Sequence, residues 1–401
     1  MNAWLTLIGT PANGVAGLTP EALAALEMAE IIVLPQRLMS DALPEDAEIH
    51  AWPSPLSDIF PKLEGWCGRN VVILATGDPL HYGVGATLLK HVPHEEMRII
   101  PSPSAFSLAA ARLGWPLQNV EMISLHGRSV STLSAFLYPG ARIITLTANA
   151  QTINEAADLL SVQGFGGSRL TILQNMGGDV EAVVQCNVGD ARRKKFSDFN
   201  TLAIDCVADN PDACLPQVPG LPDDAFVHDG QLTKREVRAA TMSALMPHPG
   251  AMLWDVGAGC GSVAIEWMRS CRNAQAIAFE RNAKRMEMIQ GNANNLGAPS
   301  LEIISGDVPK TLKGQPVPDA IFMGGAVADE TVFKACLDAL KPGGRLVING
   351  VTLEGHGALM QRFKAHGGDL VRIDVSHLDD VGGLHAMRPR MSVLQYRLVK
   401  P

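Results

Sequence analysis

The chain has 401 residues, of which 47% are hydrophobic and 18% charged, a balance typical of domains with full cores and not of a disordered chain. Its net charge of −8 argues against nucleic acid or an anionic membrane as the main partner, because both require a basic surface. No stretch approaches the roughly 18 apolar residues of a membrane span. The first cationic side chain is Arg37 and the seven cysteines form no CxxC pair, so we expect no signal peptide and a reducing, cytoplasmic location.

Strand-like runs alternate with helical patterns before residue 209. We expect strands at 5–8, 31–34, 71–75, 98–100, 122–124, 142–146, 170–173 and 202–205. We expect helices between them at 20–28, 85–91, 105–113 and 153–163. This alternation predicts an α/β fold with largely parallel sheets, divided near 114–116 into two subdomains.

Three short motifs stand out in this half. The motif Gly77-Asp78-Pro79 follows the strand 71–75, but Asp and Pro favour turns for local reasons, so a plain turn explains it equally well. The runs PSPSAFSLAAARLGWP at 101–116 and SLHGR at 124–128 are less ordinary. His126, at a strand end, is more often a surface residue than a catalyst, but the neighbouring Arg128 adds a guanidinium that could bind carboxylates.

Together these motifs resemble the tetrapyrrole methylase superfamily, and AAARLGWP and SLHGR resemble its precorrin C5-methylating branch. The resemblance covers about 1–208 and implies that S-adenosylmethionine binds in a folded form between two α/β subdomains. Two departures are the opening loop GTPANG at 9–14 and Gln174, where the family commonly has Glu. His126 and Arg128 are candidate catalytic residues on residue type and position. The resemblance implies cofactor contacts at Gly77, Asp78, Pro79, Gly83, Ser102, Ala105, Thr147, Ala148 and Asn175.

The clearest break in the chain is at 209–224, which holds four prolines and four aspartates. Such a composition continues neither a helix nor a central strand. We therefore predict a linker at 209–228 that makes few core contacts, between one domain at 1–208 and another at 229–401.

The alternation after the linker is more regular. We expect strands at 252–256, 274–280, 301–305, 320–323 and 345–349, with two late strands near 370–376 and 392–398. We expect helices at 263–269, 284–296 and 330–340. This pattern predicts a doubly wound, Rossmann-like sheet that binds a nucleotide-type ligand at its switch point.

The segment DVGAGCGS at 255–262 lies where the first of these strands turns into its helix. Its alternate glycines let the backbone approach a ligand and leave helix N-terminal amides facing it. The spacing is GxGxG, whereas a nicotinamide dinucleotide site has GxGxxG. Carboxylates at Asp255, Glu280 and Asp307 suit the cationic sulfonium of S-adenosylmethionine better than a pyrophosphate. The residues therefore favour S-adenosylmethionine over a dinucleotide.

Four segments of this half, TKREVR at 233–238, DVGAGCGS, IFMGGA at 321–326 and LKPGGRLVINGVTLE at 340–354, closely resemble the precorrin C15-methyltransferase (decarboxylating) family. The resemblance covers about 229–401 and implies a class I methyltransferase fold. The family often has Asp where Glu280 stands. The implied cofactor contacts are Thr233, Gly257, Ala258, Gly259, Cys260, Gly261, Glu280, Asp307 and Val308.

We expect a cytoplasmic homo-oligomer without a metal. The two resemblances imply a fusion enzyme of cobalamin biosynthesis with two S-adenosylmethionine sites. Its tetrapyrrole substrate, precorrin-6B, would be methylated at C5 and C15 and lose CO2 from the C12 acetate arm, giving precorrin-8X. We expect the decarboxylation in the second half, because it would raise the nucleophilicity of C15. Candidate carboxylate anchors are Arg388 and Arg390, and His385 is a candidate proton donor, although all three could equally be surface loop residues.

Two alternatives stay open. The tetrapyrrole methylase fold also serves RNA-modifying enzymes, but the acidic balance counts against an RNA methyltransferase. One half could instead be a non-catalytic tetrapyrrole-binding or assembly module. The unusual opening loop at 9–14 is the feature that favours that alternative.

Overall fold

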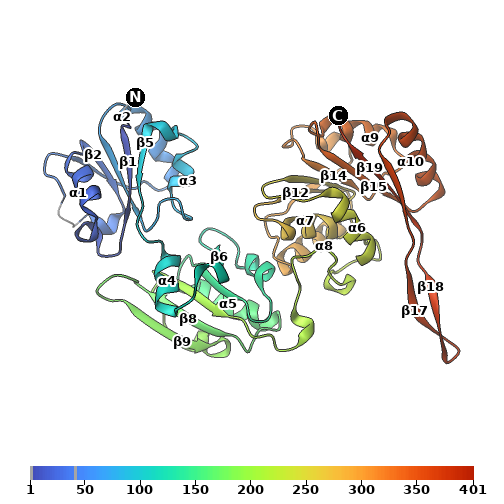
Figure 1. Ribbon diagram of the computed structural model, residues 1–401, viewed down its shortest axis with the longest axis horizontal. Helices are drawn as coiled ribbons and strands as arrows, with labels where there is room; N and C mark the ends of the chain where they lie inside the picture. Colours follow the sequence, from blue (N-terminus) through green and yellow to red (C-terminus); the bar gives the residue numbers. More distant parts are fainter. Residues whose placement is uncertain (1–2, 40–42) are drawn as a thin grey trace. The chain divides into compact units, whose positions relative to one another are not determined.

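The computed structural model describes residues 3–39 and 43–401 (Figure 1). It divides into two compact units. The first unit comprises Met1–Val130 and Pro139–Ala213, and the second comprises Ser131–Tyr138 and Cys214–Pro401. Within the described ranges, no helix has both the length and the apolar character needed to cross a membrane.

The first unit opens with a parallel five-stranded sheet in the order β3-β2-β4-β1-β5. The strands are β1 (Leu5–Thr10), β2 (Ile31–Leu34), β3 (Glu48–Ala51), β4 (Val71–Thr76) and β5 (Met97–Ile100). Separate apolar clusters cover its two faces, which explains why β2 and β4 are almost continuously hydrophobic. The helices are α1 (Pro20–Glu27), α2 (Phe60–Trp66) and α3 (Gly85–Leu88).

The second subdomain of this unit has a five-stranded sheet in the order β6-β7-β10-β8-β9. Its elements are α4 (Ala105–Leu113), β6 (Glu121–Ser124), β7 (Arg142–Leu146), α5 (Ala150–Val162), β8 (Arg169–Gln174), β9 (Ala182–Asn187) and β10 (Asn200–Asp205). Here β6 and β7 run parallel, whereas β7–β10, β10–β8 and β8–β9 are antiparallel. The expected parallel arrangement therefore holds for the first sheet but not for most of the second.

The second unit is built on a seven-stranded sheet in the order β13-β12-β11-β14-β15-β19-β16. The strands are β11 (Met252–Val256), β12 (Gln275–Glu280), β13 (Glu302–Ser305), β14 (Ala320–Met323), β15 (Arg345–Gly350), β16 (Asp369–Ile373) and β19 (Val393–Val399). The helices are α6 (Arg235–Leu245), α7 (Ser262–Ser270), α8 (Ala283–Asn295), α9 (Glu330–Ala339) and α10 (Leu353–His366). The strand order reverses at β11, whose neighbours are β12 and β14, so the carboxyl end of β11 is the switch point where such sheets bind ligands.

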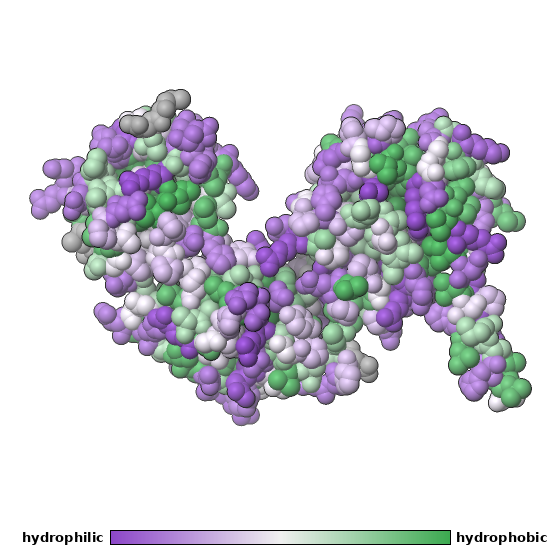
Figure 2. Space-filling view, in the orientation of Figure 1, coloured by the Kyte–Doolittle hydropathy of each residue, from purple (hydrophilic) through white to green (hydrophobic). Residues whose placement is uncertain are grey.

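A two-stranded hairpin leaves this sheet between β16 and β19. It consists of β17 (Ser376–Val381) and β18 (Leu384–Pro389), joined by Gly382 and Gly383, both at positive φ. The hairpin extends as a long arm (Figure 1), and hydrophobic residues cover part of its surface (Figure 2). The sequence pattern indicated a strand near 370–376 but did not reveal this hairpin.

Two segments outside 229–401 pack within the second unit. The residues 131–138 bring Ala135 against Gly297, where a Cβ would lie 2.4 Å from the Ala135 nitrogen. The Gln217 amide donates to the carbonyl of Ala135 at 3.0 Å. Leu221 and Phe226 are buried in the core of this unit, although both lie in the predicted linker 209–228. The second half of 209–228 is therefore part of a core.

Candidate active site

The glycine-rich loop after β11 lies against the turn after β14. Gly257 has a φ of +73°, and a Cβ there would lie 2.8 Å from the Cα of Gly325. Gly261, with a φ of +80°, would bring a Cβ to 2.9 Å from Ile289. The DVGAGCGS loop and the IFMGGA segment, which are far apart in the sequence, thus meet backbone to backbone at Gly257 and Gly325. Only glycine permits this contact at these dihedral angles.

Glu280 fixes this loop from the end of β12. One carboxylate oxygen accepts the Gly259 N–H at 3.0 Å, and the other accepts the N–H groups of Arg281 and Asn282, each at 3.0 Å. A carboxylate offers about four acceptor positions, so further donors such as ribose hydroxyls can still be accommodated. Glu280 therefore shapes the loop and also presents an acceptor to a ligand.

Asp255 lies beneath the loop. It is 1% exposed, and burial raises the pKa of its carboxyl to about 7, with the nearby charge of Glu280 adding to the effect. One oxygen accepts the N–H of Ala264 at 3.1 Å, and the other has no partner among the described residues. Asp255 does not line the cavity described next, so it supports the loop and the start of α7 from within the core.

A cavity of about 1080 Å³ opens at the carboxyl end of β11. Of the residues expected at the second cofactor site, the lining includes Thr233, Gly257, Ala258, Gly259, Glu280, Asp307 and Val308. Cys260 and Gly261 are outside the lining, and Cys260 is buried in the core. Ligand pockets usually measure roughly 300–1,000 Å³, so this cavity is large enough for a cofactor together with part of a substrate.

These residues fit S-adenosylmethionine. The glycine loop offers a floor that a Cβ would fill, and Glu280 offers an acceptor for ribose hydroxyls. Carboxylates at Asp223, Asp307 and Asp329 line the cavity and suit the cationic sulfonium and ammonium groups.

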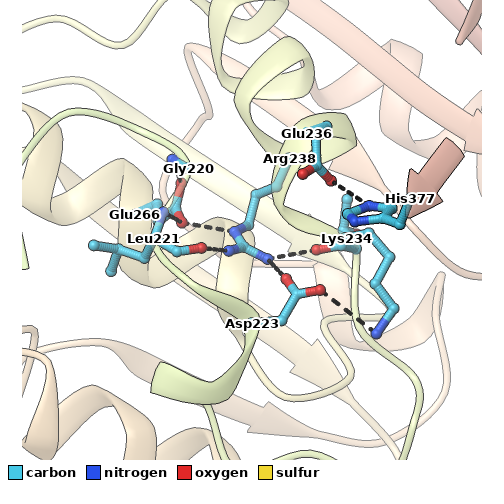
Figure 3. Close-up of polar contacts among 9 residues, drawn as sticks. Gly220, Leu221, Asp223, Lys234, Glu236, Arg238, Glu266 and His377 are labelled. Carbon is cyan, nitrogen blue, oxygen red and sulfur yellow. Dashed lines mark hydrogen bonds and ion pairs between the residues drawn. The ribbon is translucent and has the colours of Figure 1, made fainter. Parts of the chain in front are cut away.

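A buried arginine holds the TKREVR segment at the cavity (Figure 3). Arg238 is fully buried in α6, and its Nε donates to Glu266 at 2.6 Å. Another guanidinium nitrogen donates to Asp223 at 3.2 Å and to the carbonyl of Thr233 at 2.5 Å, and the third donates to the carbonyl of Leu221. Because the charge is paired and its donors are used, this buried cluster can fix Thr233 in place.

Glu266 extends this cluster to the end of the proline-rich stretch. Its two carboxylate oxygens accept the N–H groups of Gly220 and Leu221 at 2.8 and 2.9 Å. The sequence did not single out Arg238 or Glu266, because a charged residue within an amphipathic helix is usually on its solvated face. Arg238 and Glu266 together thus connect the TKREVR segment to the end of the proline-rich stretch.

The base of the hairpin also lines the cavity, through Val375, His377, Pro389, Arg390 and Met391. Arg390 is therefore placed where a substrate anchor was expected. His377, which the sequence did not suggest, has its Nε2 3.7 Å from the carboxylate of Glu236 (Figure 3).

The other two hairpin candidates are outside the cavity lining. His385 pairs with Asp380 across the hairpin at 3.4 Å, close to the turn. Arg388 pairs with Asp379 at 2.7 Å, and both candidate side chains are 65% exposed. Their cross-strand partners explain their conformations without a ligand.

In the first unit, the carboxyl ends of β1, β4 and β5 converge. A Cβ at Gly9 would lie 2.4 Å from the Gly77 carbonyl oxygen and 2.6 Å from the Ser102 nitrogen. The following loop is tightly folded, because a Cβ at Gly83 would lie 2.4 Å from the Pro79 oxygen. Asp78 accepts the N–H of Leu80 at 2.8 Å, as a turn-forming Asp does. Ala105 begins α4, directly after its N-cap Ser104.

The other first-unit candidates lie near the ends of the strands in the second sheet, on the side where β6, β7 and β8 end and β10 begins. They are Thr147, Ala148, Asn175, His126 and Arg128. The Thr147 hydroxyl donates to the Asn200 carbonyl at 2.9 Å, and Ala148 follows it. Asn175 has a φ of 51° and donates its N–H to Phe199 at 3.0 Å. His126 and Arg128 follow β6 and are exposed.

Tyr82 joins the loop after β4 to this second sheet. Its hydroxyl donates to the Met122 carbonyl at 3.0 Å, and the Arg128 guanidinium lies 5.7 Å from its ring centroid. Its φ of 57° is unusual for a bulky side chain. Tyr82 thus links the Gly77–Gly83 loop to the segment that carries His126 and Arg128.

Comparisons with known proteins agree with this arrangement. A tetrapyrrole (corrin/porphyrin) methylase model matches residues 5–192, and a precorrin methyltransferase domain model matches 224–400. A Sinorhizobium protein named precorrin-6Y C(5,15)-methyltransferase (decarboxylating) is 41% identical over 401 residues, covering 100% of this chain and 97% of its own length. A Mycobacterium tuberculosis protein of the same name is 34% identical, covering 99% and 100% of the two chains.

A crystal structure of the C-terminal domain of precorrin-6Y C5,15-methyltransferase from Rhodobacter capsulatus is 38% identical, covers 46% of this chain and 100% of its own, and gives a TM-score of 0.44. The matches to the two full-length relatives cover 100% and 99% of this chain, and therefore both units. Both resemblances inferred from the sequence are thereby confirmed. The chain belongs to the family of precorrin-6Y C(5,15)-methyltransferases (decarboxylating).

Proposed function

We propose that the chain methylates precorrin-6B at C5 and C15 with S-adenosylmethionine and removes CO2 from the C12 acetate arm, giving precorrin-8X. The observation that carries the proposal is the cavity of about 1080 Å³, where the glycine loop and Glu280 share a lining with Arg390 and His377. A cofactor floor and a cationic hairpin base in one cavity suit methyl transfer to an anionic substrate. Membership of this family also argues against the alternative of an RNA methyltransferase.

The proposal includes two cofactor sites. In the second unit, the glycine loop would face the methionine part, Glu280 would accept the ribose hydroxyls, and the turn at Asp307–Val308 would bound the adenine. In the first unit, the loop after β4, the start of α4 and the sheet edge at Thr147 and Asn175 would form the site. When bound, S-adenosylmethionine supplies an electrophilic methyl group. The protein residues then contribute alignment and exclusion of water.

Arg390 is the strongest candidate for a carboxylate anchor. In the described part of the chain, three other cations that line the cavity each face an aspartate within 4 Å: Lys234, Arg281 and Arg285. Arg390 has no acidic partner among the described residues. A guanidinium without an acidic partner can bind a substrate carboxylate in a bidentate manner. We therefore place the C15 methylation and the decarboxylation in the second unit.

We also propose that the protein is a homo-oligomer in the cytoplasm and that nucleic acid is not a partner. Leu378, Leu384 and Met387 are 66%, 75% and 63% exposed on the hairpin. A lone two-stranded hairpin is marginally stable, and exposed apolar groups of this kind mark contact surfaces. A second copy of the chain would bury them. Sedimentation of the protein and of Leu378→Ser/Leu384→Ser/Met387→Ser tests this, since an unchanged mass would contradict it.

The central experiment incubates the whole protein with S-adenosylmethionine and precorrin-6B. Mass spectrometry should find two added methyl groups and the loss of one CO2 per substrate. Arg390→Met should raise KM for the precorrin, whereas Arg388→Met, on the same hairpin but outside the cavity lining, should not. A product without CO2 loss would contradict the decarboxylase assignment.

A further inference from the structure

His377 is placed at the beginning of β17, at the base of the hairpin and in the lining of the cavity. Its imidazole is 47% exposed and lies 3.7 Å from the carboxylate of Glu236, which belongs to α6 and also lines the cavity. Figure 3 shows the two side chains facing one another. The pair combines a ring that can reach a ligand with a carboxylate that can orient it.

The decarboxylation needs a proton donor in this cavity. As the bond between the acetate methylene and its carboxylate breaks, CO2 leaves and the electron pair passes into the conjugated macrocycle. The pair then returns to the methylene carbon, where it forms a bond to one incoming proton, so that a methyl group remains. One proton is consumed for each CO2 released, and no oxidant or reductant is required.

The lining offers few groups that suit this task. Histidine is the side chain that ordinarily exchanges a proton near neutral pH, and His377 is the single histidine in the cavity lining within the described ranges. Lys234, the lysine of this lining, is already engaged by Asp223 at 3.6 Å. His385 is held by Asp380 near the hairpin turn, outside the lining.

Charged groups around His377 come from two elements. Glu236 faces it from α6, Arg388 is its cross-strand neighbour on β18, and Arg390 lies just beyond that strand. Arg388 is itself paired with Asp379 at 2.7 Å. Glu236 can therefore orient the imidazole, while Arg390 remains available for the substrate.

We infer that His377 is the general acid that protonates the carbon left by CO2, and that Glu236 is the positioning residue that orients it. This inference rests on the proposed function, because it assumes that the decarboxylation takes place in this cavity. It adds the identity of the donor and assigns the hairpin base a direct part in the chemistry.

The test compares His377→Gln with His385→Gln in the full-length protein, incubated with S-adenosylmethionine and precorrin-6B. General acid catalysis contributes about 100-fold or more, so we expect His377→Gln to slow formation of the decarboxylated product by at least that factor. His385→Gln should match the wild type. Both variants should keep wild-type affinity for S-adenosylmethionine by calorimetry, which shows that the second unit is folded.

Chemical rescue separates proton donation from a structural role. Added imidazoles should restore CO2 release in His377→Ala, at rates that follow the acidity of each imidazole, whereas they should leave His385→Ala unchanged. Glu236→Gln should lower kcat for CO2 release with little change in KM. Equal CO2 release by His377→Gln and the wild type, or no rescue of a folded His377→Ala, would overturn the inference. Absence of CO2 release from the wild type would instead overturn the proposed function.

Discussion

Gly257 and Gly325 approach so closely that a Cβ on Gly257 would lie 2.8 Å from the Cα of Gly325. The loop after β11 and the turn after β14 are therefore fixed against each other by backbone contact. A ligand that rests on this loop also depends on the turn after β14, which the FMGGA segment forms. A side chain at Gly257 must therefore displace one of the two segments.

We expect Gly257→Ala to abolish cofactor binding in the second unit, because it adds both a collision and an unfavourable positive φ. Gly343→Ala is the matched control, since Gly343 has a φ of +75° with nothing within 4 Å of its Cβ position. Left-handed backbone costs an alanine about 1 kcal/mol in each variant, so only the collision differs. Calorimetry with S-adenosylmethionine should detect one binding event fewer in Gly257→Ala than in the wild type. Gly343→Ala should keep all the binding events of the wild type. Equal binding by the two variants would argue against the loop as the cofactor site.

Arg238→Met should destabilise the second unit by about 3–5 kcal/mol, because it leaves Glu266 as a buried charge without its partner. Arg235→Met, on an exposed position of the same helix, should have little effect. Urea unfolding followed by tryptophan fluorescence measures both free energies. If the free energy of unfolding fell by a similar small amount in both variants, the cluster would not anchor α6.

Asp255 should make the second unit less stable as pH rises. The pKa of its carboxyl is raised from 3.8 to about 7 in the folded protein, so the folded state binds the proton more tightly than the unfolded state. The stabilising effect of protonation is complete below pH 3.8 and is lost as pH rises towards 7. The free energy of unfolding of Asp255→Asn, relative to wild type, should therefore increase across this range by an amount on the order of a few kcal/mol. A difference that stays constant with pH would contradict the raised pKa.

A fragment that begins at Cys214 should be more stable than one that begins at Asp229. The shorter fragment lacks Leu221 and Phe226, and burial of each such side chain contributes about 1.5–3 kcal/mol. The shorter fragment also lacks the N–H groups of Gly220 and Leu221, which donate hydrogen bonds to Glu266. Thermal unfolding of both fragments measures the difference. Equal midpoints would show that the proline-rich stretch adds nothing to the core.

The sequence predicted the α/β class, the family and the glycine-rich turn after β11, because glycine spacing and strand ends are local signals. It did not predict that β8, β9 and β10 pair antiparallel, since strand direction depends on the connections between strands. Leu221 and Phe226 were missed because prolines and aspartates surround them.

The hairpin shows most clearly why the rest could not be predicted. His385 and Arg388 were chosen on residue type, but the pairing of Ser376 with Pro389 and of Val381 with Leu384 places His385 near the turn. The same pairing places His377 and Arg390 at the base. Only the register of the two strands decides which residues line the cavity, and the sequence pattern contains no direct sign of it.

The segment 131–138 gives the chain an interleaved order, because it leaves the first unit, packs within the second and returns. A single cut between Ala213 and Cys214 would therefore not separate the two units, because eight residues of the second unit, Ser131–Tyr138, would remain on the N-terminal piece. The two pieces should behave as a complementing pair. The boundary between the units in space thus matches no single boundary in the sequence, since a short piece of the N-terminal half is a structural element of the second unit.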